Sequence, residues 1–166
     1  MKKTIILLSI ALFISAWSMA QQQQLSFPFQ GGSQIMTRFF KDSLTVSPEI
    51  VKSKASGVVV FKFTADEKGI IKKMVMYYAD DAILVPPVID ALKRSSHKWI
   101  IPDKEKVHDF IITFSINFNP PAKVDAFDQK AVYQFNTHKK PILSINQVPL
   151  DMATLLPTVV VNYDLK

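Results

Sequence analysis

Two histidines and a pair of aspartates are the side chains in this sequence that could perform acid–base chemistry or bind a metal. His97 and His108 stand near the ends of predicted elements, and Asp80 and Asp81 are adjacent at a predicted strand-to-helix turn. Imidazole and carboxylate groups transfer protons in many enzymes, but they must lie within hydrogen-bond reach of the reacting group. Aspartate at such a turn is far more often a turn former or a helix cap. An enzyme or ligand-binding protein that uses these four loop residues is therefore the alternative hypothesis.

The motif content excludes several classes of enzyme. The sequence has no cysteine, which excludes disulfides, thiolate zinc sites, cysteine nucleophiles and lipid attachment through an acceptor cysteine. It also lacks a G-x-S-x-G nucleophile elbow, an H-E-x-x-H helix and a P-loop. We therefore predict no catalytic residue, no metal site and no cofactor.

The first twenty residues have the pattern of a secretory leader. Lys2 and Lys3 precede an apolar stretch over 5–14, and Ser18 and Ala20 place small side chains where signal peptidase accepts them. The apolar stretch is too short to span a bilayer. We predict a signal peptide over 1–20, cleaved after Ala20, then a flexible leader over 21–30. The predicted location is the periplasm, with secretion beyond it left open and no membrane span retained.

The charge of the processed chain argues against nucleic-acid binding. The whole chain has 20 basic and 14 acidic residues, and cleavage removes Lys2 and Lys3, so 18 − 14 leaves a net charge of +4. Its longest basic clusters are pairs such as Lys72 with Lys73, and no basic stripe with stacking aromatic residues is present. We predict no nucleic-acid partner.

The middle of the chain, 31–119, has the pattern of a small α+β domain. Helical stripes or helix start signals occur over 34–42, at Ser47-Pro48 and at Pro86-Pro87. Apolar residues alternate over 57–65 and 109–119, and a turn over 66–69 leads to a further strand over 70–78, with a bulge predicted across Lys72-Lys73. These elements predict a three-stranded antiparallel sheet with the first strand central and helices on one face. The strand over 109–119 would then lie at an edge.

The remaining residues, 120–166, are predicted to form a β-rich C-terminal extension. The patterns indicate strands over 132–135, within 140–150 and over 158–165, and a short helix over 151–156. Its predicted role is either to pack on the main sheet or to cover the edge strand.

A set of residues in order over about 29–119 resembles the C-terminal domain of the TonB family of energy transducers. The resemblance lies in a glycine that opens the first strand, alternating Val and Phe, an acidic turn that ends in glycine, a Lys-Trp pair and a final strand, here Gly57, Val59, Phe61, Phe63, Asp66, Gly69, Ile71, Lys98-Trp99 and Ile116-Asn117-Phe118. The chain departs from the family in having no long Pro-rich spacer and a leader that looks cleavable rather than an anchor. The resemblance implies a transport-related cell-envelope protein that binds other proteins without catalysis, through its last strand.

The predicted binding mode is strand addition, in which an extended segment pairs with an exposed sheet edge. The predicted partner is a segment of an envelope protein or receptor, with peptidoglycan as a further partner left open. Selectivity would come from the alternate side chains of the strand over 109–119, namely Ile111, Thr113, Ser115 and Asn117. Two alternatives remain: the chain's own tail covers that edge, or the edge pairs with a second copy in a homodimer.

Overall fold

The structure, a computed structural model, describes residues 27–121, 125–145 and 152–164. The elements in chain order are α2 (Gly32–Ser43), α3 (Pro48–Ser53), β1 (Gly57–Asp66), β2 (Ile71–Ala79), the 3-10 turn η1 (Ala82–Leu84), α4 (Val85–Arg94), β3 (Val107–Phe118), α5 (Ala126–Thr137), β4 (Ile142–Leu143), β5 (Thr154–Leu155) and β6 (Val159–Tyr163). The fold is therefore mixed α+β, as predicted.

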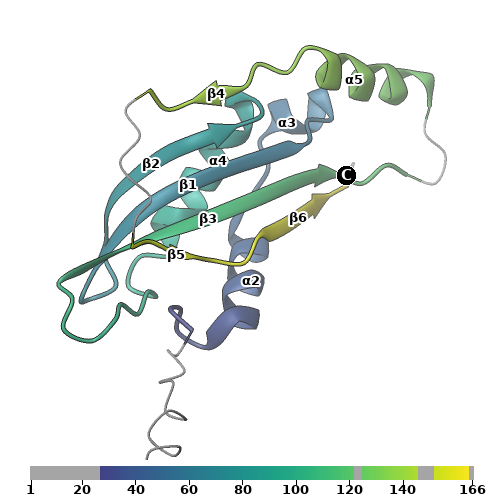
Figure 1. The fold of residues 1–166 in the computed structure, drawn as a ribbon. Coiled ribbons are helices and arrows are strands. Elements are labelled where there is room, and N and C mark those ends of the chain that lie inside the picture. The colour runs from purple at the N-terminus through teal and green to yellow at the C-terminus, as the bar shows by residue number, and fades with distance from the viewer. Residues whose placement is uncertain (1–26, 122–124, 146–151, 165–166) are drawn as a thin grey trace, which may run out of the picture.

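The sheet is larger than the predicted three strands. It has six strands in the order β4-β2-β1-β3-β5, and β6 also pairs with β3 (Figure 1). β1 is central and antiparallel to both β2 and β3, as the connections predicted. The prediction of three strands is wrong because the tail adds strands at both sides: β4 pairs antiparallel with β2, whereas β5 and β6 pair parallel with β3.

Three helices cover one face of this sheet. Figure 1 looks onto the opposite face, with α2, α3 and α4 behind the strands. Phe61, Phe63, Phe110 and Phe114 share the covered interior and are at most 2% exposed. The alternation of large apolar side chains in β1 and β3 thus identified the inner face correctly.

Helix starts agree with the sequence in one case and differ in another. The Ser47 side chain caps α3 at the Ile50 N–H, and Pro48 occupies the first turn, as predicted. At α2, however, the cap is Gly31 with φ +86°, and Ser33 already lies inside the helix. Glycine adopts this left-handed conformation without strain, so the helix begins earlier than the predicted stripe over 34–42 indicated.

β2 contains the predicted bulge and a further one. The register against β1 shifts between Ile71 and Lys73, which leaves Lys72 as the extra residue. It shifts again between Met76 and Tyr78, with Tyr77 as the extra residue. At each bulge the alternation of β2 shifts by one residue relative to β1. The bulges therefore decide which N–H and C=O groups of β2 point away from β1, toward the outer edge of the sheet.

Two elements of the tail differ from their predictions. Val132 to Phe135, predicted as a strand, lie in α5, and the predicted helix over 151–156 contains β5 instead. The strand predicted over 158–165 is present as β6. In the predicted strand over 140–150, 142–143 form β4, and 146–150 lie outside the described residues.

The N-terminal predictions fall largely outside the described residues, which begin at 27. Within the predicted leader over 21–30, Phe29 is 1% exposed and its ring centroid lies 5.0 Å from that of Trp99. Phe29 therefore belongs to the core. Among the residues from 27 onward that the structure describes, no helix has the length and apolar content to cross a membrane.

Candidate functional site

The four predicted contact residues lie on an internal strand. Ile111, Thr113, Ser115 and Asn117 alternate along β3, and their partners across β1 and β6 place them on the sheet face without α2, α3 and α4. All four are half-buried. The edge of β3 beyond them pairs with β5 and β6, so the alternative in which the tail covers this edge is the arrangement found.

β6 is firmly attached to the sheet. Val159, Val161 and Tyr163 are at most 7% exposed, and the Tyr163 hydroxyl lies 2.8 Å from the Ala55 carbonyl oxygen. Full burial of an apolar side chain such as that of Val159 or Val161 stabilises the folded state by about 1.5–3 kcal/mol. An incoming segment that displaced β6 would have to replace all of these contacts.

The outer edge of β2 is covered over a short length. β4 pairs with Tyr78 and Ala79, and the Ser144 N–H donates to the Tyr77 carbonyl. At the other end of β2, the Ile71 N–H donates to the Ser96 hydroxyl. A stretch of edge therefore remains between these two contacts, over residues 72–76.

Strand alternation identifies which backbone groups point outward from this stretch. The Asp80 N–H donates to Val58 and the Asp66 N–H donates to Ile70, so even-numbered residues of β1 face β2. Lys62 and Thr64 therefore face β2 and pair with Val75 and Lys73. Met74 and Met76, opposite the odd-numbered Phe63 and Phe61 of β1, direct their N–H and C=O groups outward. No described residue is hydrogen-bonded to these four groups.

The side chains along this edge differ between its two faces. Lys73 and Val75 stand on the open face, opposite Thr64 and Lys62, and Lys73 is exposed. The two methionines lean toward the helices and are partly buried against the core. A strand added here would meet one cation and one apolar side chain on the open face.

The two aspartates of the alternative hypothesis, Asp80 and Asp81, have structural roles as hydrogen-bond acceptors. Asp80 accepts hydrogen bonds from the Val58 N–H at 2.9 Å and from the Tyr78 hydroxyl. Burial alone would raise the pKa of Asp80, but these hydrogen bonds and the nearby Lys139 ammonium hold it below its usual value. Asp81 caps η1 at the Ile83 N–H.

The histidines lie far from these aspartates. His108 is at the start of β3 opposite Ala65, whereas Asp80 follows Ala79, which is opposite Val59. The six residue steps along β1 from Val59 to Ala65 span about 20 Å. His97 is exposed in the loop after α4, and its N–H donates to the Gly69 carbonyl at the turn between β1 and β2, the end of β2 away from Asp80. The four side chains therefore do not converge on one site.

His108 instead joins two segments that sequence spacing does not connect. Its Nδ1 lies 2.7 Å from a Glu105 carboxylate oxygen, and its Nε2 lies 2.7 Å from the Thr154 hydroxyl. Thr154 belongs to β5 and is 46 residues from His108. This hydroxyl–imidazole–carboxylate chain attaches the tail to the beginning of β3.

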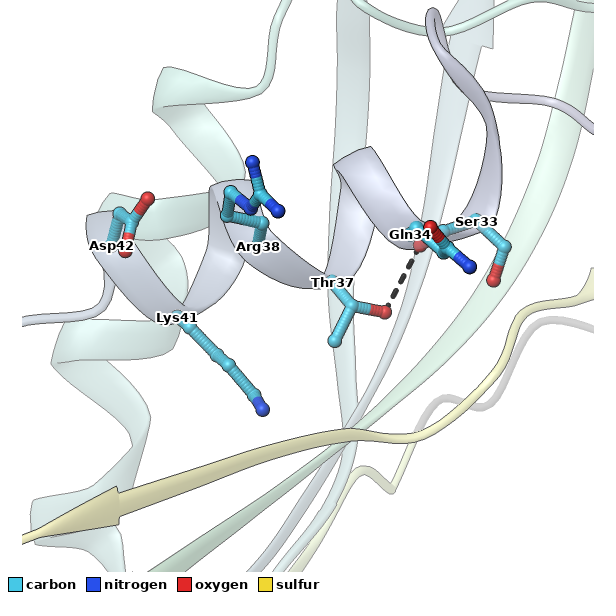
Figure 2. Close-up of a pocket in the computed structure, with 6 residues that line it drawn as sticks. All are labelled: Ser33, Gln34, Thr37, Arg38, Lys41 and Asp42. Atoms are coloured by element: carbon cyan, nitrogen blue, oxygen red, sulfur yellow. Dashed lines mark hydrogen bonds between the residues drawn. The ribbon is translucent and has the colours of Figure 1, made fainter.

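A polar depression on α2 is a further candidate site, but the side chains that line it do not converge on one point. Figure 2 shows Arg38 and Lys41 pointing in different directions from α2, with Lys41 directed toward β6. The Thr37 hydroxyl donates to the Ser33 carbonyl at 3.0 Å within the same helix. The described residues also contain no group of three or more His, Cys, Asp or Glu side chains that could hold a metal ion.

Comparisons with family models, curated proteins and solved structures gave no match to this chain.

Proposed function

We propose that this protein is a non-enzymatic, exported periplasmic module that binds an extended segment of an envelope protein by strand addition. The observation that carries the proposal is the outer edge of β2, where the backbone groups of Met74 and Met76 point outward without a partner among the described residues. Such an edge is a template for another strand. The resemblance of 29–119 to the C-terminal domain of the TonB family supports the same mode of binding.

The place of binding follows from what already covers the sheet. β3 is internal, and displacement of β6 would expose three buried side chains. The β2 edge requires no such displacement of a described strand. Ile111, Thr113, Ser115 and Asn117 then keep a role as open-face residues, across which the remainder of a bound partner would lie.

The partner segment can be found by crosslinking from a position beside this edge. A photoreactive residue in place of Lys73 is expected to capture an envelope protein in intact cells, and a peptide that covers the crosslinked segment then serves as the ligand. The matched control is the same residue at Lys106, which is exposed in the loop before β3. Equal capture of the same proteins from both positions would contradict binding at β2.

Two substitutions at Met74 separate backbone pairing from side-chain contact. Met74→Pro removes the outward N–H, and proline is tolerated at edge positions of this kind. We expect at least about tenfold weaker peptide binding, which corresponds to the loss of one or two hydrogen bonds. Met74→Leu keeps the N–H and the side-chain volume and should bind like the wild type. Equal binding by the two variants, with both folded by circular dichroism, would refute strand addition here.

A further inference from the structure

A groove between α3 and α5, independent of the β2 edge, has the features of a ligand site. Its volume is about 790 Å³, and Ile83 of η1 lines it together with residues from the two helices. This volume lies within the usual range for sites that bind small molecules. We propose that the groove binds a single-chain anionic amphiphile, a fatty acid, with its chain along the apolar floor and its carboxylate at the basic rim.

The two walls of the groove are held in place by a buried ion pair. The Lys54 ammonium at the end of α3 lies 3.3 Å from the Asp128 carboxylate of α5, and both side chains are at most 12% exposed. The same ammonium donates to the Val51 carbonyl and lies 5.5 Å from the centre of the Phe118 ring. This anchor attaches the first turn of α5 to the end of α3, and the adjacent face of α5 lines the groove.

The groove leaves the large apolar side chain of Phe127 without cover. Phe127, Lys130, Ala131 and Gln134 line it at the i, i+3, i+4 and i+7 spacing of one helix face. Phe127 is 74% exposed although it lies at the groove. An aliphatic chain laid between Phe127 and Ile83 would remove this apolar surface from water.

The charges at the rim select the head group. Lys52 from α3 and Lys130 from α5 contribute cations from the two opposite walls, and His138 lies at the end of α5. Glu49 is the acidic side chain among the lining residues. A carboxylate head group is therefore attracted, whereas a cationic head group on a chain of the same length is repelled.

The test compares amphiphiles that differ in the head group. Laurate and dodecyltrimethylammonium, both below their micelle concentrations, are titrated into the processed protein by calorimetry. We expect saturable binding of laurate to one site, at least about fivefold tighter than the cationic compound, as a partly screened pair of charges predicts. Equal affinity for both compounds, or no saturable binding of laurate, would overturn the proposal.

Matched variants locate the binding to this groove. Lys130→Glu and Phe127→Ala should each weaken laurate binding about fivefold, through lost attraction and lost apolar cover. The controls are Lys106→Glu, near the start of β3, and Tyr133→Ala, which removes another exposed aromatic side chain of α5. All four side chains are exposed, so the variants should fold, which thermal melting verifies. Losses in the controls as large as in the groove variants would show nonspecific binding and contradict the proposal.

Discussion

At the scale of single residues, the buried charges of this protein are bonded to their neighbours. The Lys62 ammonium, on the open face of the sheet, lies 2.7 Å from the Asp109 carboxylate, which also accepts a hydrogen bond from Thr64. Among the described residues, every buried side-chain nitrogen or oxygen has a hydrogen-bond partner. Asp80, Asp81 and His108, three of the four residues considered for chemistry, thus serve to attach segments to one another.

The lowered pKa of Asp109 predicts that the protein loses a specific part of its unfolding free energy in acid. Burial alone would raise its pKa, but the hydrogen bonds from Lys62 and Thr64 hold it below the usual value. A lowered pKa in the folded state contributes stability above the unfolded pKa of about 3.9, and this contribution disappears as the pH falls through the folded pKa. Asp109→Asn should therefore lose less unfolding free energy than the wild type between pH 7 and pH 3, as measured by urea denaturation. The exposed Asp103→Asn serves as the control, and an unchanged pH dependence in Asp109→Asn would contradict the assignment.

Local signals predicted some of these residue roles and not others. Asp81 was predicted as a turn former or a helix cap, and it is a cap, because its place before a helix start is visible in the sequence. The bond from His108 to Thr154 was not predictable, because the two residues are 46 positions apart and meet only through the parallel pairing of β5 with β3. No short spacing pattern encodes such a contact.

At the scale of elements, periodicity predicted β1, β2 and β3 because each has one buried and one open face. α5 was missed because its Val132-Tyr133-Gln134-Phe135 sequence also fits a strand. The signal that could have found it is Asp125, whose side chain accepts from the Asp128 N–H at the start of the helix. The pairing of the tail with β3 was left as one of two alternatives, since the edge pattern of β3 is the same with either partner.

β6 offers a matched test of this pairing, because adjacent valines face opposite sides. Val161 is 6% exposed and Val160 is 41% exposed. Val161→Ala removes the equivalent of two buried methylenes and should lower the unfolding free energy by about 1.5 kcal/mol or more. Val160→Ala should change it by less than about 0.5 kcal/mol. Equal effects, or a larger effect at Val160, would indicate that β6 is paired in a different register.

At the scale of the whole molecule, one compact core extends from Phe29 to Tyr163. The sheet that covers this core has its β3 side closed by the chain's own tail, whereas a stretch of β2 remains open among the described residues. This asymmetry directs the proposed partner to β2. The pairing of β5 and β6 with β3 also makes the tail part of the folded unit rather than an appendage.

Export is a prediction about the whole chain that can be tested directly. Ser18-Met19-Ala20 predicts cleavage after Ala20. N-terminal sequencing of the protein recovered from a bacterial periplasm should begin at Gln21. An Ala20→Lys substitution should block processing and leave a precursor, whereas recovery of unprocessed wild-type protein from the membrane fraction would contradict the prediction.

Amide hydrogen exchange of the free, processed protein tests the open edge of β2 most directly. Lys73 and Val75 direct their N–H groups toward β1, so these amides should exchange slowly. Met74 and Met76 direct theirs outward and should exchange much faster, and binding of the partner peptide should then protect these two. Slow exchange at all four amides in the free protein would show that the edge is already paired and would contradict the account.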